Sequence, residues 1–160
     1  SGNAQGSDEE ADQINQLVND LLQCDYTDRD GVTRRVTLDQ IIIVAPYNMQ
    51  VRKIAQRIAG AQVASVDKFQ GREGAIVILS MCASEGHSSP RGIEFLFSKN
   101  RLNVAISRAT TLAFVVGSAN LLKTPCSSLE QMRLLNFFCQ IVEAGKQSSK
   151  PPTEPVLAPA

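Results

Sequence analysis

The sequence contains no tryptophan, a single histidine (His87) and four cysteines among its 160 residues. The cysteines form no CxxC pair, so neither a zinc site nor a disulfide framework is expected. The longest apolar runs, such as 41–46 and 75–79, lie far below the ~18 residues that a membrane-spanning helix needs. No charged-then-apolar signal segment opens the chain. These absences favour a soluble domain of a reducing, intracellular compartment with no membrane partner and no metal site of its own.

Enough apolar sequence is present for one domain with its own core, since 43% of the residues are hydrophobic. The net charge is zero, but residues 1–30 hold eight acids against one base, whereas residues 50–108 hold nine bases against four acids. A local excess of cations suits a polyanion, either nucleic acid or nucleotide phosphate. Ordinary solvated charge is the alternative, and counts alone do not decide between the two.

Candidate strands alternate with candidate helices along the chain. Ser7 and Glu10 form a capping box that predicts a helix over about 8–23. A final helix is expected after Ser128, with Met132 and Phe138 on its core face. Short apolar runs predict strands at 41–45, 63–66, 75–81 and 112–117, of which the first and the last are expected to be buried. The alternation predicts an α/β domain with a mostly parallel sheet and helices on both faces.

The predicted organisation is a flexible N-terminus (1–7), one domain (8–145) and a disordered tail (146–160). The tail is assigned on composition, because it is polar and rich in proline. Cys82 is interpreted as buried strand filling. The phenylalanines at 95, 97, 137 and 138 are interpreted as core.

Two stretches place polar and cationic side chains beside small residues and next to an apolar run. They are SVDKFQGREG (65–74) and KNRLNVAISRA (99–109). Ligands of open parallel sheets bind at the carboxyl ends of the strands. We therefore expect both stretches to contribute to a ligand site near that edge.

Three segments resemble motifs IV, V and VI of superfamily 1 helicases, in that order and at suitable spacing. They are APYNMQVRKI (45–54), SVDKFQGREGAIVILS (65–80) and NRLNVAISRA (100–109). The resemblance covers roughly residues 8–145. Residues 90–109 and the segment after them look closer still to bacterial helicases fused to a RecB-like nuclease domain.

The resemblance implies a motor in which ATP lies in a cleft between two RecA-like domains. The sequence has no G-x-x-x-x-G-K-[ST] motif and no apolar strand that ends in Asp-Glu. The chain therefore resembles the second RecA-like domain, which has the P-loop NTPase fold without a P-loop of its own. ATP with Mg²⁺ is the implied cofactor, with its metal ligands in the first RecA-like domain, and the isolated fragment is expected to be inactive.

For the nucleotide, the resemblance implies a role for five residues of motifs V and VI. Arg108 matches the arginine that reaches the γ-phosphate, with a surface ion pair as its alternative role. Gly71 fits a tight turn close to a ligand. Glu73 matches the glutamate that contacts the sugar, or else it pairs with Arg72, which faces either nucleotide or solvent. Arg101 either faces the nucleotide or organises the motif VI helix.

Motif IV adds Tyr47 and Gln50 as nucleotide-binding candidates, with Tyr47 alternatively packing beneath the cleft. The start of motif V lies near the strand backbone in this family, which makes Ser65, Asp67 and Lys68 nucleic-acid candidates. Lys68 as plain surface charge is the alternative. Such contacts hold phosphates without reading sequence.

The sequence thus predicts the second motor domain of an ATP-dependent superfamily 1 DNA helicase in the bacterial cytoplasm. Its partners would be single-stranded DNA, the first RecA-like domain of the same parent chain and a fused RecB-like nuclease domain. An RNA helicase domain and a non-catalytic binding module are the alternatives. The nuclease-fused resemblance favours DNA.

Overall fold

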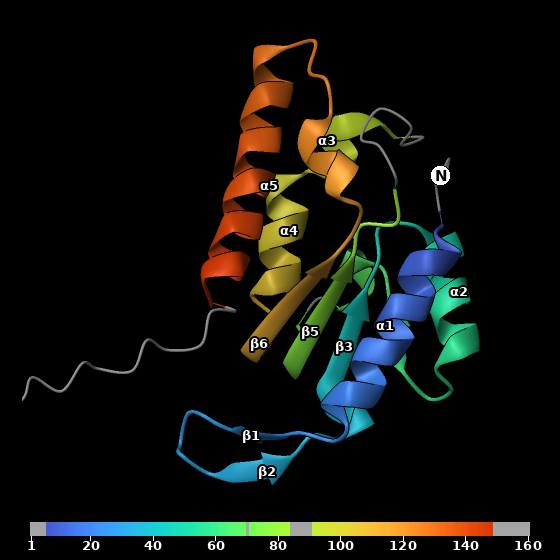
Figure 1. Cartoon of the computed structure of the whole chain (residues 1–160), viewed down its shortest axis with the longest axis vertical. Coiled ribbons are helices and arrows are strands. Elements are labelled where there is room, and N and C mark those ends of the chain that lie inside the picture. The colour runs from blue at the N-terminus through green and yellow to red at the C-terminus, as the bar shows by residue number, and fades with distance from the viewer. Residues whose placement is uncertain (1–5, 70, 84–90, 149–160) are drawn as a thin grey trace, which may run out of the picture.

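A computed structural model describes residues 6–69, 71–83 and 91–148. Within them, a parallel sheet has the strand order β4-β3-β5-β6, and a separate antiparallel hairpin pairs β1 with β2 (Figure 1). The elements are α1 (Asp8–Leu21), β1 (Asp25–Thr27), β2 (Thr33–Arg35), η1 (Leu38–Gln40), β3 (Ile41–Val44), α2 (Asn48–Arg57), β4 (Gln62–Ala64), η2 (Val66–Phe69), β5 (Gly74–Ser80), α3 (Gly92–Leu96), α4 (Lys99–Ile106), β6 (Ala109–Val116), η4 (Ala119–Lys123) and α5 (Leu129–Ser148).

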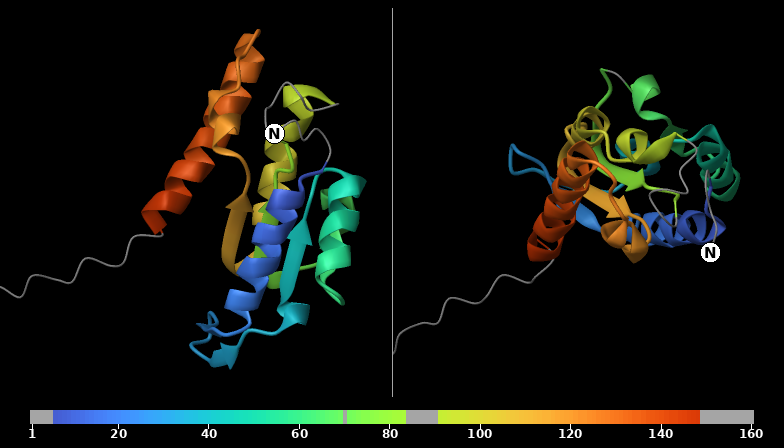
Figure 2. Two further views of the ribbon diagram at one scale, coloured as in Figure 1. Left: turned by 45° about the vertical axis from the view of Figure 1, so that its right-hand side comes forward. Right: turned by 90° about the horizontal axis from the view of Figure 1, so that it is seen from above.

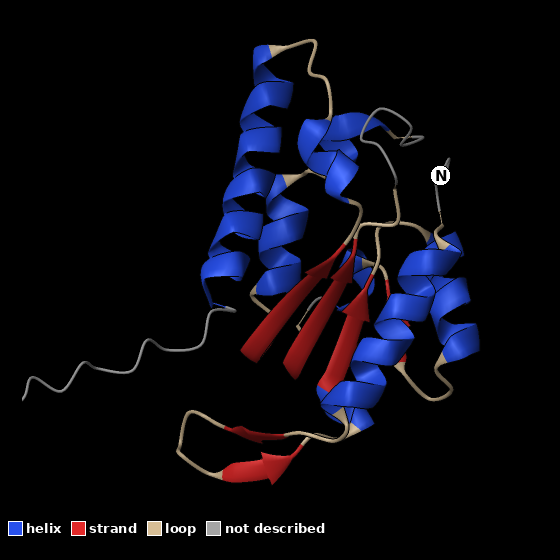
Figure 3. Ribbon diagram, in the orientation of Figure 1, coloured by secondary structure: helices blue, strands red, loops and turns tan. Residues whose placement is uncertain are grey.

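Helices cover both faces of the parallel sheet (Figures 2 and 3). Side chains alternate along β3, so Ile41 and Ile43 pack in one apolar cluster with α1 and α2. Ile42 and Val44 pack in the other cluster, which includes Leu102 of α4 and residues of α3 and α5. The predicted α/β, RecA-like class with a mostly parallel sheet is confirmed.

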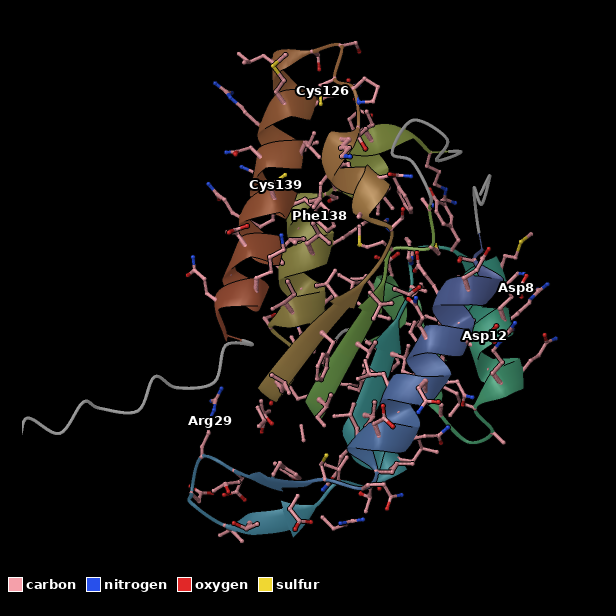
Figure 4. The ribbon with its side chains drawn as sticks, viewed as in Figure 1. Asp8, Asp12, Arg29, Cys126, Phe138 and Cys139 are labelled. Carbon is pink, nitrogen blue, oxygen red and sulfur yellow. The ribbon has the colours of Figure 1, made fainter. Side chains whose placement is uncertain are left out.

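The first helix packs along α2 and is held there by opposite charges. Asp8 pairs with Lys53 and lies 2.8 Å from Arg57, and Asp12 lies 2.5 Å from Arg57. Figure 4 shows Asp8 and Asp12 on α1 beside α2. Two of the nine mid-chain bases are therefore neutralised by the acidic N-terminal helix.

Strand β6 differs from the prediction of a buried strand at 112–117. It forms one edge of the sheet, its residues are exposed or half-buried, and 43% of Leu112 is exposed. The predicted core position Met132 is also wrong, since it is 54% exposed while Phe138 of the same helix is buried. The helical period placed Phe138 correctly but not Met132, because the buried width of α5 depends on the elements that pack against it, which include α3 and η4.

Several boundaries also differ from the prediction. Helix α5 runs to Ser148, past the predicted end of the domain at 145, and residues 149–160 lie outside the described part. Ser7 is buried and caps α1, so it belongs to the domain rather than to a flexible end. The β1-β2 hairpin was not among the predicted strands. None of the helices in the described residues combines the length and apolar character that crossing a bilayer requires.

Candidate functional site

The connections that follow β3 and β4 leave the sheet side by side at its carboxyl edge. Val44 is opposite Ala64, and the Ala45 N–H donates to the Ala64 carbonyl at 3.2 Å. Tyr47 follows β3 and is buried, with its ring centre 5.4 Å from that of Phe95. Ser65 follows β4. The ring of Tyr47 therefore packs beneath this edge.

A polar hollow of about 360 Å³ lies at this edge, and we call it the strand-end hollow. It holds two of the predicted nucleic-acid residues together with two arginines. Its lining residues are Pro46, Tyr47, Asn48, Met49, Ser65, Asp67, Arg91 and Arg101.

A second hollow of about 350 Å³ lies between η2 and α4, and we call it the α4 hollow. Arg101 and Val104 are three residues apart on α4, so they lie on one helix face, and Arg108 follows four residues later, past the helix end. The α4 hollow is lined by Val66, Asp67, Ser98, Asn100, Arg101, Val104 and Arg108.

Arg101 and Asp67 line both hollows. Nη2 of Arg101 lies 3.6 Å from Oδ2 of Asp67, and its guanidinium carbon lies 4.1 Å from the centre of the Phe95 ring. The 3.6 Å distance exceeds hydrogen-bond length, so the pair is an ion pair on a partly exposed wall. This pair separates the hollow that contains Tyr47 from the hollow that contains Arg108.

Arg108 is half-buried, and its Nε has no hydrogen-bond partner although the atom is shielded from solvent. Leaving a buried donor unpaired costs about 1–3 kcal/mol. The backbone of Arg108 is fixed, because its carbonyl accepts from the Gly74 N–H at 3.0 Å. Because Arg108 lines the α4 hollow, an anionic ligand there would lie next to a half-buried arginine side chain.

The turn that precedes β5 carries three further predicted residues. Gly71 adopts a φ of 82°, which requires glycine-like freedom, and the Arg72 N–H donates to the Phe69 carbonyl at 3.1 Å. Arg72 and Glu73 are both exposed, and the described residues contain no ion pair between them. The alternative role of Glu73, an ion pair with Arg72, is therefore not observed.

The expectation of one site at the carboxyl edge is wrong for part of the set. Gly71, Arg72 and Glu73 precede β5, and Arg108 precedes β6, so their backbones lie at the amino edge of the parallel sheet. Only Tyr47 and Ser65 directly follow strands. The candidates are distributed from one edge to the other, because α4 and η2 run along the sheet and carry side chains between the edges.

Gln50 lies away from both hollows' linings and is fully buried. Its amide oxygen accepts from the Ser7 N–H at 2.7 Å, and its amide nitrogen donates to Ser80 Oγ at 3.0 Å. Both groups of the amide are thus occupied within the chain. This geometry assigns Gln50 to positioning α1 against β5, while direct nucleotide contact stays a prediction. Lys68, in contrast, is exposed on η2.

The capping box at the start of α1 is only half formed. Ser7 Oγ accepts from the Glu10 N–H at 3.1 Å, as predicted. The Glu10 carboxylate instead accepts from Ser80 Oγ and from the Cys82 N–H, both at 2.8 Å. Burial raises the pKa of Glu10, although these hydrogen bonds oppose the shift.

Cys82 is buried as predicted, but it follows β5 rather than lying within it. It adopts a left-handed φ of 49°, and its N–H is held by Glu10. Burial also raises the pKa of its thiol, so it stays protonated. The four cysteines are free.

Sequence reasoning missed Arg91 and Ser80, and it gave Glu10 and Phe95 other roles. Phe95 was assigned to the core but is only partly buried, with Arg91 at 4.7 Å from its ring centre. The apolar residues around Phe95 gave no sign that Arg91 and Arg101 both lie over its ring. The described residues contain no group of acidic, histidine or cysteine side chains that could hold a metal ion.

A parallel sheet with helices on both faces, with Arg101 on the helix that precedes its edge strand and Arg108 just after that helix, is consistent with the RecA-like class of α/β domains. Comparison with known families agrees. The chain belongs to the family described as "AAA domain", whose model matches residues 3–120.

Curated relatives are helicases by name. The chain is 34% identical over 113 residues to "Probable RNA helicase armi" of Drosophila melanogaster, covering 65% of this chain and 9% of that protein. It is 40% identical over 87 residues to "DNA polymerase alpha-associated DNA helicase A" of Schizosaccharomyces pombe, covering 52% and 13%. It is 39% identical over 95 residues to "ATP-dependent helicase upf1" of the same yeast, covering 52% and 10%. The match thus spans about a tenth of each relative.

Proposed function

We propose that this chain is the second motor domain of an ATP-dependent superfamily 1 helicase that acts on DNA. The main support is Arg108. This residue lines the α4 hollow, and its shielded Nε has no hydrogen-bond partner. The named helicases among the relatives support the same assignment. We further propose ATP with Mg²⁺ as cofactor, with the metal ligands in the first RecA-like domain of the parent.

Arg108 would serve as the arginine finger. A guanidinium stabilises the charge that spreads over the oxygens of the transferred phosphoryl group. The Gly74–Arg108 backbone hydrogen bond fixes the backbone of Arg108 relative to the turn that resembles motif V. Glu73, on that turn, would contact the nucleotide sugar. Ser65, Asp67 and Lys68 would contribute to the single-strand track.

The test compares the parent protein with its Arg108→Ala variant. Strand-stimulated ATP hydrolysis should fall ~10³–10⁵-fold while nucleotide binding is retained, which is the range for arginine fingers. Arg108→Lys should also be strongly impaired, because an ammonium lacks the planar fork. Arg133→Ala, an exposed arginine of α5 outside both hollows, is the matched control. An unchanged rate in Arg108→Ala would make Arg108 structural and favour a non-catalytic binding module.

An RNA substrate is the second candidate, and it is supported by the name of the Drosophila relative. The same assay with single-stranded DNA and RNA of one length and sequence distinguishes the two. Larger stimulation by DNA supports our proposal, and larger stimulation by RNA contradicts it.

The parent's wider organisation is also a proposal. A fused RecB-like nuclease domain and a bacterial, cytoplasmic setting rest on the resemblance of residues 90–109 and the segment after them. The relatives described above are eukaryotic. The coding sequence upstream of this segment in the parent gene would decide whether a nuclease domain is fused to it.

A further inference from the structure

Arg91 lies outside the three helicase-like segments, directly before α3. It is exposed, and its guanidinium carbon lies 4.7 Å from the centre of the Phe95 ring. Within the described residues it makes no ion pair or hydrogen bond. An arginine held over a ring keeps its donors available, because the stack uses only the guanidinium face.

The charges around the strand-end hollow are unbalanced. Arg91 and Arg101 line it with one carboxylate, that of Asp67. Asp67 already pairs with Arg101. The positive charge of Arg91 therefore has no counterpart in the lining, while Ser65 and Asn48 add neutral polar groups.

The hollow is also distinct from the one that holds Arg108. The two share Asp67 and Arg101, whose ion pair forms their common wall. An anion at Arg91 therefore lies on the Tyr47 and Ser65 side of that wall. On this side lies Ser65, one of the residues proposed above for the single-strand track.

We propose that the strand-end hollow binds one backbone phosphate of single-stranded nucleic acid, with Arg91 as its charged ligand. The inference rests on the proposed helicase function and adds a strand contact outside the motifs. The contact reads no sequence, because an exposed guanidinium on a phosphate recognises only charge and geometry.

The test measures the Kd of the parent protein for a fluorescent oligo(dT) at several salt concentrations. A single-strand phosphate contact contributes ~0.7 to the slope of log K against log salt. Arg91→Ala should lower the slope by ~0.7 and weaken binding about fivefold at 0.1 M salt. Arg91→Lys should restore the slope, and Arg133→Ala is the control for charge loss elsewhere.

The outcomes separate this inference from the proposed function. An unchanged slope in Arg91→Ala, with strand-stimulated ATPase intact in the wild type, overturns only the Arg91 site. A raised KM for ATP with unchanged strand affinity would assign the phosphate to the nucleotide and also overturn it. A wild-type parent without strand-stimulated ATPase overturns the proposed function itself. Thermal unfolding of Arg91→Ala confirms that the variant is folded.

Discussion

Arg101 and Asp67 form the wall between the two hollows, with 3.6 Å between Nη2 and Oδ2. The pair joins α4 to η2, so it links the segment resembling motif VI to that resembling motif V. Asp67 is 72% exposed and Arg101 is 30% exposed at their side chains. Arg101 is therefore the more buried partner of this ion pair.

We expect Asp67→Asn to change the free energy of unfolding by no more than about 1 kcal/mol, because exposed ion pairs contribute little. Arg101→Ala should cost about 1–2 kcal/mol, since it also loses the stack on Phe95 and the packing of its stem. Urea unfolding of the 160-residue chain measures both. Equal losses of unfolding free energy in the two variants would show that the ion pair, rather than the Phe95 ring, holds Arg101.

Glu10→Gln should remove a pH dependence of stability. The folded-state pKa of Glu10 is raised above its ordinary value of 4.5. Its stabilising contribution is therefore fully present below 4.5 and is lost as pH rises through the raised pKa. The difference in unfolding free energy between wild type and Glu10→Gln should move in favour of the variant across that window.

The measurement is urea unfolding of both proteins at pH 4 to 8, with Glu130→Gln, an exposed glutamate of α5, as the control. A constant difference between wild type and Glu10→Gln would show that Glu10 titrates normally. Glu10→Ala should be worse at every pH, by about 1–3 kcal/mol, because Ser80 and the Cys82 N–H lose their acceptor.

Gly71 and Gly74 should respond differently to the same substitutions. A Cβ at Gly74 would meet the Gln40 carbonyl oxygen and Ile42 Cγ1, each at 3.0 Å. A Cβ at Gly71 meets nothing within 4 Å, and only the φ of 82° opposes it. Asparagine tolerates that φ, so Gly71→Asn should be milder than Gly71→Ala, which should cost about 1–2 kcal/mol.

At Gly74 the order should reverse, since asparagine is larger than alanine and the obstacle there is backbone. Thermal unfolding of the four variants provides the comparison. In the parent, Gly74→Ala should also lower ATPase activity, because it displaces the strand start that holds the Arg108 carbonyl. A Gly74→Asn variant as stable as Gly71→Asn would contradict the expected steric clash at Gly74.

Sequence patterns predicted the elements best where one local rule decided the outcome. The β-branched run at 41–45 produced a strand buried on both faces, and Ser7 caps α1 as expected. The hairpin after α1 was missed because its strands are short, polar and exposed, which leaves no alternation to detect. Leu112 was predicted to be buried because the apolar pattern of an edge strand can match that of a central strand.

What the sequence by itself determined is the order of strands and helices and the presence of the three helicase-like segments. Only the tertiary structure decided that Glu10 bonds Ser80 instead of closing its own capping box, and that two arginines lie over the ring of Phe95. Local periodicity depends on neighbours within a few residues, which the sequence contains directly. The partner of a buried carboxylate or an exposed ring depends on which elements the packed core brings together.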